Sequence, residues 1–181
     1  MTDWHDKPTV LKGDAGEAVL DSYLKGRGVM AYQPVFNGAH PFDRLCASMD
    51  KKTLFIAEAK NKPRRAYYPD TGINASHYND YVHIMETYHI DVWISFIDEK
   101  MKQMYGNFLS VLIQDCEVII ENAQGLRSEW YPKHKNGIVY FPLISMIKMA
   151  DLSEIEVATV SKHSTRKREY DDAYELSFPN P

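Results

Sequence analysis

The sequence lacks the features that would place this chain in a membrane or outside the cell. Among 181 residues only Cys46 and Cys116 are cysteines, and neither has a second cysteine or a histidine at zinc-finger spacing. No run of about 18 apolar residues occurs, so we expect no membrane span. Residues 1–6 are polar and carry no apolar signal-peptide region. We therefore expect a cytoplasmic, intracellular protein with reduced thiols.

The chain also lacks an overall excess of basic charge. It has 21 lysines and arginines against 25 acidic residues, a net charge of -4. Nucleic-acid-binding proteins are more often basic, so the total weakens that function class without excluding it. Basic residues do gather between positions 51 and 65, where Glu58 is the single acid. Because salt screens charges beyond roughly 8–10 Å, such a local patch matters more than the total.

The length fits one domain, which we place at residues 12–150. Residues 1–11 and 152–181 are polar or charged, and we expect flexible or loosely attached tails there. The patterns that carry a functional signal all fall within residues 12–98. Residues 99–150 form an extension that the sequence does not assign.

Hydrophobic periodicity predicts an α/β fold with a central mixed β-sheet flanked by helices. Asp14 followed by Glu17 is a capping-box pattern, which predicts a helix from Asp14 to about Lys25. The other expected elements up to residue 98 are strands at 29–36, 42–49 and 54–60, a helix at 75–88 and a strand at 91–98. Beyond residue 101 we expect strands at 104–108, 117–121 and 138–143, a helix or strand at 109–114, and a helix at 144–150.

The strand at 54–60 is the most informative stretch. It begins with apolar residues and ends with Glu58-Ala59-Lys60. Side chains alternate between the two faces of a strand, so the charges of Glu58 and Lys60 share one face. Burying a lone charge is unfavourable unless it is paired or bound to a metal. A frayed strand end with both side chains exposed is the simpler alternative.

Two further acids are expected to approach Glu58. Asp43 starts the strand that forms a hairpin with the Glu58 strand, and Glu17 lies on the core-facing side of the first helix. Asp43 could instead cap its turn, and Glu17 could only complete the helix cap. Three neighbouring carboxylates would repel one another unless a cation lay among them. Oxygen ligands of this kind suit Mg²⁺ or Mn²⁺.

These motifs resemble the PD-(D/E)XK nuclease superfamily. The resemblance is carried by Pro41-Phe42-Asp43, Glu58-Ala59-Lys60 and Gly16-Glu17, in that family's arrangement. The pattern is most similar to the Holliday-junction-resolvase-like members. It departs from the family signature in one respect, because Phe42 separates Pro41 from Asp43. The resemblance implies a restriction-endonuclease-like core of order α-β-β-β-α-β.

The resemblance also implies a role for each residue of the quartet. Asp43, Glu58 and the Ala59 carbonyl would hold Mg²⁺ or Mn²⁺, and Glu17 would bind a second metal or a metal water. Lys60 would orient or activate the attacking water and stabilise charge on the phosphate. Glu17, Asp43, Glu58 and Lys60 are thus the expected catalytic residues.

Cations and aromatic rings follow the Glu58 strand and suit phosphates and unpaired bases. An ordinary solvated loop at 61–74 is an equal alternative. On the next helix, His77 and Tyr81 lie four residues apart and share a face. Some branches of the superfamily have glutamine and tyrosine at that spacing, although His77 could simply be a helix-start residue. The predicted nucleic-acid-binding residues are Lys62, Arg64, Arg65, Tyr67, Tyr68, His77 and Tyr81.

The leading hypothesis is therefore a divalent-metal-dependent endonuclease acting on DNA, with branched or single-stranded DNA as candidate substrates. The first alternative is a catalytically silent nucleic-acid-binding or assembly module of the same fold. The second is an interaction protein that uses its aromatic surface. A homodimer is plausible, because two-fold-related sites can cut both strands of a duplex. The sequence leaves open DNA versus RNA and endo- versus exonucleolytic cleavage.

Overall fold

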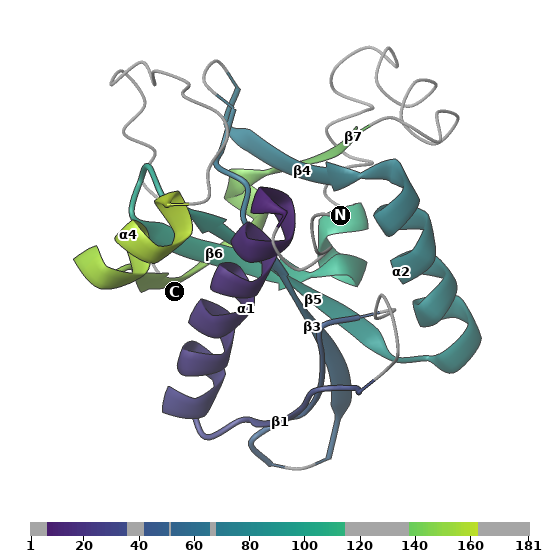
Figure 1. The fold of residues 1–181 in the computed structure, drawn as a ribbon. Coiled ribbons are helices and arrows are strands. Elements are labelled where there is room, and N and C mark those ends of the chain that lie inside the picture. Colours follow the sequence, from purple (N-terminus) through teal and green to yellow (C-terminus); the bar gives the residue numbers. More distant parts are fainter. Residues whose placement is uncertain (1–6, 36–41, 51, 66–67, 115–137, 163–181) are drawn as a thin grey trace.

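The computed structural model describes residues 7–35, 42–50, 52–65, 68–114 and 138–162, and its centre is a mixed sheet in the order β1-β2-β3-β5-β6-β8 (Figure 1). These strands are β1 (Met30–Tyr32), β2 (Arg44–Ala47), β3 (Leu54–Lys60), β5 (Asp91–Asp98), β6 (Gln103–Phe108) and β8 (Ile147–Asp151). A second sheet pairs β4 (Asp70–Asn74) with β7 (Ile138–Pro142). The helices are α1 (Pro8–Gly26), α2 (Ala75–Tyr88), the 3₁₀ turn η2 (Leu143–Ser145) and α4 (Glu154–Ser161). The α/β fold with a central mixed sheet is confirmed.

Helices cover the large sheet on both faces (Figure 1). On one face α1 and α4 pack over a core that includes Leu20, Ala57 and Val160. On the other face α2 and the small sheet pack over a core that includes Ile56 and Phe141. The sheet is therefore buried between two apolar layers, as expected for an α/β protein.

β3 lies inside the sheet and fixes its register. It pairs antiparallel with β2, where Arg44 lies opposite Ala57, and parallel with β5, where Glu58 lies opposite Ile94. The predicted alternation of faces holds, because Ile56 packs on the α2 side and Ala57 on the α1 side. A slip of one residue would exchange these faces and place Glu58 in the α1 core.

Three predicted elements have the bounds that the structure shows: the strand at 54–60, the helix at 75–88 and the strand at 91–98. The strand predicted at 104–108 is β6, and residues 109–114 are helical. The strands predicted at 29–36, 42–49 and 138–143 are present but shorter. The strand expected at 117–121 lies outside the described residues.

The predicted start of the first helix was wrong. The helix begins at Pro8, and its N-cap is Lys7 rather than Asp14. Proline at the first helical positions has a fixed φ suited to a helix and lacks only an N–H that has no intrahelical partner there. Asp14 and Glu17 therefore lie within the helix, and the expected flexible lead-in at 1–11 is helical from Pro8.

The C-terminal expectations also need correction. The helix predicted at 144–150 is instead η2 followed by β8, which pairs antiparallel with β6. The expected tail from residue 152 contains α4, whose N-cap Ser153 and Glu156 form a capping box. Fully buried Val160 anchors α4 in the α1 core. Pairing at the sheet edge and apolar burial thus order residues 147–161, although composition alone suggested a loosely attached tail from residue 152.

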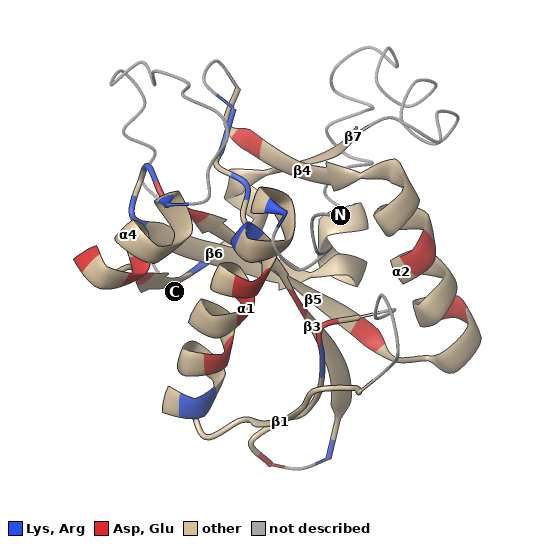
Figure 2. Cartoon of the chain, in the orientation of Figure 1, with Lys and Arg blue, Asp and Glu red and all other residues tan. Residues whose placement is uncertain are grey.

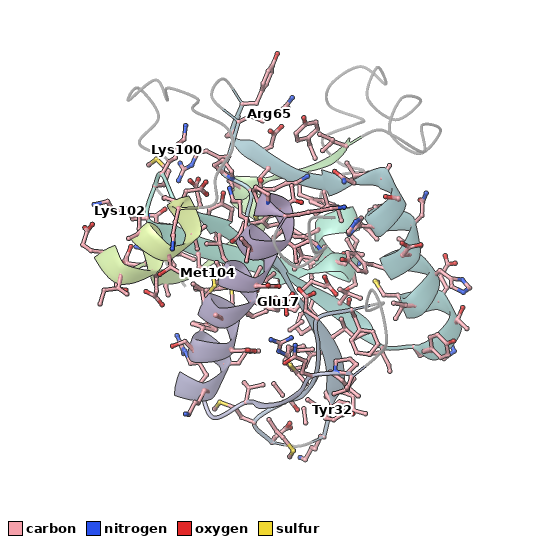
Figure 3. All side chains as sticks on the ribbon, viewed as in Figure 1. Glu17, Tyr32, Arg65, Lys100, Lys102 and Met104 are labelled. Atoms are coloured by element: carbon pink, nitrogen blue, oxygen red, sulfur yellow. The ribbon has the colours of Figure 1, made fainter. Side chains whose placement is uncertain are left out.

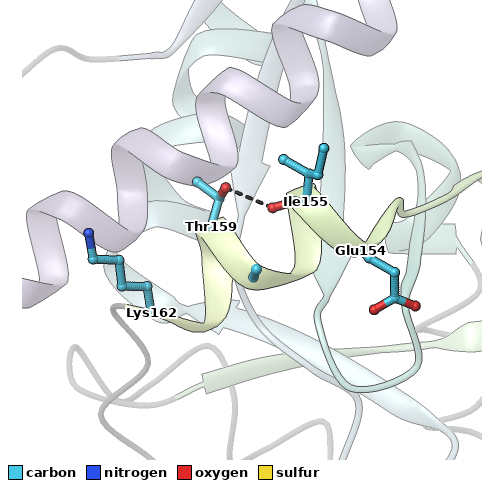
Figure 4. A pocket seen from close by; sticks show the side chains of 5 residues that line it. Glu154, Ile155, Thr159 and Lys162 are labelled. Carbon is cyan, nitrogen blue, oxygen red and sulfur yellow. Dashed lines mark hydrogen bonds between the residues drawn. The ribbon is translucent and has the colours of Figure 1, made fainter.

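The outer side of α4 is open to solvent. It carries a shallow depression lined by Glu154, Ile155, Ala158, Thr159 and Lys162 (Figure 4). Thr159 Oγ1 donates to the Ile155 carbonyl within the helix, and the Ile155 side chain is exposed. None of these residues belongs to the acidic and basic cluster described below. In the described part of the chain, no helix has the length and apolar character that a membrane crossing needs.

The loop expected at 61–74 ends in a buried strand instead. Thr71 and Ile73 of β4 are each 1 % exposed, and β4 leads directly into α2. Gly72 permits the close pairing with β7, because a Cβ there would lie 2.4 Å from the Val139 carbonyl oxygen. The chain therefore adds one strand to the predicted order between β3 and α2.

We predict that Gly106→Ala destabilises the protein by more than about 2 kcal/mol. A Cβ at this position of β6 would lie 2.1 Å from the Ile94 carbonyl oxygen, so the β5–β6 pairing must shift. Urea unfolding followed by circular dichroism measures the loss. Gly13→Ala is the control: nothing lies within 4 Å of its added Cβ, and alanine should stabilise helix α1 by roughly 0.5–1 kcal/mol. An unchanged midpoint for Gly106→Ala would contradict the described packing.

Candidate active site

The β2–β3 hairpin brings Asp43 and Glu58 together. Asp43 immediately precedes β2, where the antiparallel register places it beside Glu58 of β3. The Asp43 backbone N–H donates to Glu58 Oε1 at 2.8 Å, and the Ala59 N–H donates to Asp43 Oδ2 at 2.8 Å. Backbone donors thus hold both carboxylates in place, and this juxtaposition agrees with the expectation from the sequence.

Lys60 and Tyr81 complete the bonding of Glu58. Lys60 Nζ lies 2.9 Å from Glu58 Oε2, as expected for two side chains on one face of β3. The Tyr81 hydroxyl, from α2, donates to the same oxygen at 2.7 Å. Glu58 is 1 % exposed and Tyr81 3 %. The frayed-strand alternative is therefore wrong, because the structure buries the acid and pairs it.

His77 lies one helical turn before Tyr81, at the rim of the same cluster. Its Nδ1 is 3.5 Å from Lys60 Nζ and 3.4 Å from the Tyr81 hydroxyl. Burial and the charge of Lys60 lower the pKa of His77, which favours the neutral imidazole. His77 is therefore placed to accept a hydrogen bond from Lys60. Tyr81 is too deeply buried for the contact with nucleic acid that its position in the sequence suggested, and it positions Glu58 instead.

The two carboxylates strain each other electrostatically. Burial, with a further contribution from the charge of Glu58, raises the pKa of Asp43 to about 7. A carboxylic acid in water has a pKa near 4, so the raised pKa of Asp43 means that its ionised form beside Glu58 is disfavoured. A cation between them would relieve the repulsion.

The sequence analysis missed Arg44, the residue that Glu17 contacts. Arg44 Nη1 lies 3.0 Å from Glu17 Oε2, while Nε and Nη2 each lie 2.7 Å from an oxygen of Asp21. Burial alone would lower the pKa of Arg44, but the bonds to Asp21 and Glu17 raise it above its usual value. Glu17 lies on the sheet-facing side of α1 (Figure 3). The sequence did contain a signal for this pairing. Glu17 and Asp21 lie four residues apart and share a helix face, and a basic residue begins the next strand but one.

The chemistry of the two carboxylates is that of ligands for a hard divalent cation. Asp43 and Glu58 are oxygen ligands suited to Mg²⁺ or Mn²⁺, and the Ala59 carbonyl follows Glu58 directly. Asp43 Oδ1 accepts no hydrogen bond from any described residue, which leaves it available as a ligand. Within the described ranges, no group of three or more acidic, histidine or cysteine side chains is arranged to hold a metal.

Arg64 is not the exposed cation that its loop position suggested. It is 5 % exposed, and both its backbone N–H and its Nε donate to Asp98 Oδ2. Asp98, at the end of β5, is itself fully buried and also accepts from the Tyr105 hydroxyl. Arg64 therefore neutralises a buried acid, and its predicted contact with nucleic acid is not supported.

Arg65 points away from the cluster and lies between aromatic rings. Its guanidinium is 4.2 Å from the Tyr68 ring centroid and 3.8 Å from that of Tyr140, and it pairs with Asp70 at 2.5 Å. The Tyr68 side chain remains 51 % exposed. Lys62 Nζ donates to Asn74 near the start of α2. Tyr67 lies outside the described residues, so its predicted role is untested.

Charge is therefore separated within the molecule. Basic residues gather near the start of α1 and along the connection from β3 to β4, while acidic residues lie lower on α1 and at the centre (Figure 2). The carboxylate pair lies in this acidic centre, and Lys60 is bonded to Glu58 within it.

Comparisons with known proteins return one structural likeness. No family model matches the sequence, and no curated protein sequence matches it. The fold is similar to Hjc, a Holliday junction resolvase of the archaeal hyperthermophile Archaeoglobus fulgidus, with 16 % identity and a TM-score of 0.41. The match covers 55 % of this chain and 79 % of that one. At this identity and score the likeness carries no conclusion about the activity of this chain.

We predict that Arg64→Met destabilises the protein by about 3 kcal/mol or more, because it leaves Asp98 buried without its cation. Lys62→Met, two residues earlier and with its bonded Nζ at the surface, should cost less than about 1 kcal/mol. Urea unfolding curves of the two variants make the comparison. Equal stability of the two variants would show that the Arg64–Asp98 pair does not stabilise the fold.

Proposed function

We propose that this protein is a divalent-metal-dependent nuclease that hydrolyses phosphodiester bonds of DNA, most simply as an endonuclease. The proposal rests on one observation: Asp43 and Glu58 lie side by side with Lys60 bonded to Glu58. A carboxylate pair beside a lysine, held by backbone donors at the β2–β3 hairpin, is an arrangement suited to phosphodiester cleavage. The resemblance of the motifs to PD-(D/E)XK nucleases supports the same reaction.

Each residue has a definite task in this proposal. Asp43, Glu58 and the Ala59 carbonyl would hold the cation, which would act as a Lewis acid toward the scissile phosphate. The Lys60 ammonium would orient the attacking water and stabilise the charge that develops on the phosphate. Tyr81 fixes Glu58, and the Ala59 N–H fixes Asp43, so the ligands need little rearrangement.

Single-stranded or branched DNA is the substrate class we propose. Tyr68 offers a half-exposed ring that stacks on Arg65 and could stack on an unpaired base. Duplex DNA hides its bases in the stack, so this surface favours junctions and single strands. A homodimer acting on both strands, and a cytoplasmic location, remain predictions.

We predict that Asp43→Asn and Lys60→Ala each lower the cleavage rate at least about a hundredfold while DNA binding is kept. Asn cannot supply the carboxylate charge for the cation, and Ala removes the ammonium. Cleavage of supercoiled plasmid, single strands and a four-way junction with Mg²⁺, Mn²⁺ or EDTA provides the measurement. Binding is followed by fluorescence anisotropy in the presence of Ca²⁺.

Lys102→Ala is the matched control, because Lys102 pairs with Glu154 at the surface and should leave cleavage unchanged. DNA binding without metal-dependent cleavage by the wild type would favour the silent binding module. Neither binding nor cleavage would exclude both proposals.

We predict that Tyr68→Ala weakens binding to single-stranded or junction DNA by roughly tenfold and leaves duplex binding nearly unchanged, since a stacked base contributes about 1–3 kcal/mol. Tyr32→Ala is the control, because Tyr32 of β1 is 62 % exposed and lies far from Arg65 (Figure 3). Anisotropy titrations at one salt concentration compare the variants. An equal loss on all three DNA forms would count against base stacking on Tyr68.

A further inference from the structure

Glu17 is paired with an arginine rather than placed among metal ligands. The Arg44 side chain is 5 % exposed and lies between α1 and β2, where it binds Glu17 and both oxygens of Asp21. A guanidinium stays protonated at every physiological pH, so this cation is permanent. Breaking the contact to Glu17 would leave a nearly buried charge with one fewer partner, which is unfavourable.

The same guanidinium also holds the backbone of the candidate site. Arg44 Nη1, the nitrogen that contacts Glu17, donates to the Asp43 carbonyl oxygen at 2.7 Å. The Asp43 N–H is already bonded to Glu58. Both sides of the Asp43 peptide backbone are therefore fixed, one by Glu58 and the other by Arg44. Through Arg44, the carboxylate of Glu17 acts on the position of Asp43 without touching it.

The exposure of Glu17 differs from that of Glu58. Glu58 is 1 % exposed. Glu17 keeps part of its side chain, 24 %, in solvent. No set of three possible ligands is assembled among the described residues, although Asp43, Glu58 and Glu17 all belong to them.

We propose that the centre takes one divalent cation per chain, on Asp43, Glu58 and the Ala59 carbonyl, and that Arg44 keeps Glu17 out of the ligand set. Arg44 thus pairs with Glu17, to which the resemblance to nucleases would assign a second metal or a metal water. Glu17 is a positioning residue that orients Arg44, and Arg44 orients Asp43. This inference rests on the proposed function, because it concerns the same centre.

Counting bound ions tests the proposal without measuring cleavage. Mn²⁺ is titrated into the full-length wild-type protein, and free Mn²⁺ is followed by electron paramagnetic resonance. The Lys60→Ala protein is titrated in the same way, with and without bound single-stranded DNA. We expect one ion per chain in the wild type, and none in Asp43→Asn. Two ions in the wild type, falling to one in Glu17→Gln, would overturn the proposal.

Two substitutions at Glu17 separate positioning from ligation. Gln keeps an oxygen that accepts from Arg44, so Glu17→Gln should bind one Mn²⁺ with nearly the wild-type Kd. Ala removes that oxygen, and Glu17→Ala should weaken binding of the one ion by about tenfold or more, as for other residues that orient metal ligands. Asp21→Asn is the control: it changes the other partner of Arg44 but leaves Glu17 in place. Equal losses in Gln and Ala would identify Glu17 as a ligand and refute the proposal.

The outcomes also separate this inference from the proposed function. If the wild type cleaves DNA and binds two ions, the inference fails and the nuclease stands. If neither the wild type nor the DNA-bound Lys60→Ala protein binds Mn²⁺, and the wild type does not cleave DNA, both fail. If the wild type binds one ion, Glu17→Gln keeps that binding and no DNA is cleaved, the inference of one ion stands and the proposed nuclease function fails.

Discussion

The interaction on which the candidate site depends is the forced proximity of two carboxylates, the buried Glu58 and the partly buried Asp43. Asp43 and Glu58 are held together by the hairpin register and by backbone N–H donors, although like charges in a poorly solvated place repel. Burial and this repulsion are what raise the pKa of Asp43 to about 7. The sheet maintains the geometry because the core on both of its faces resists a change of register.

The cations around this pair are used unequally. Lys60 is bonded directly to Glu58, whereas Arg44 reaches the pair through a backbone carbonyl and through Glu17. Arg64 neutralises the buried Asp98 at the end of β5, and Arg65 contacts the rings of Tyr68 and Tyr140. Within the basic stretch at 51–65, Lys60 thus lies at the site, Arg64 in the core and Arg65 against aromatic rings.

Much of the architecture follows from local pattern, and the failures have physical causes. The Leu54–Lys60 strand and the 75–88 helix were predictable, since their periodicity reports burial directly. Pro8 was missed as a helix start because a capping box further on looked stronger. β8 was read as a helix because pairing with β6, which no local pattern records, decides its state. The Asp43–Glu58–Lys60 group was predictable from spacing, whereas the pairing of Arg44 was not, since its acidic partners Glu17 and Asp21 are distant from it in sequence.

The burial of Arg44 bears on how such a site can be built. An arginine beside an acidic site supplies a permanent charge and directional bonds, but unlike a metal ion it cannot lower the pKa of a bound water. In the proposed centre with one cation, the nucleophile would therefore depend on that cation and on Lys60. The gain is preorganisation: the Asp43 backbone is fixed before any ion arrives, so less ordering remains to be done on binding. On this argument Arg44 and the backbone donors set the shape of the site, and the proposed cation would supply its chemistry.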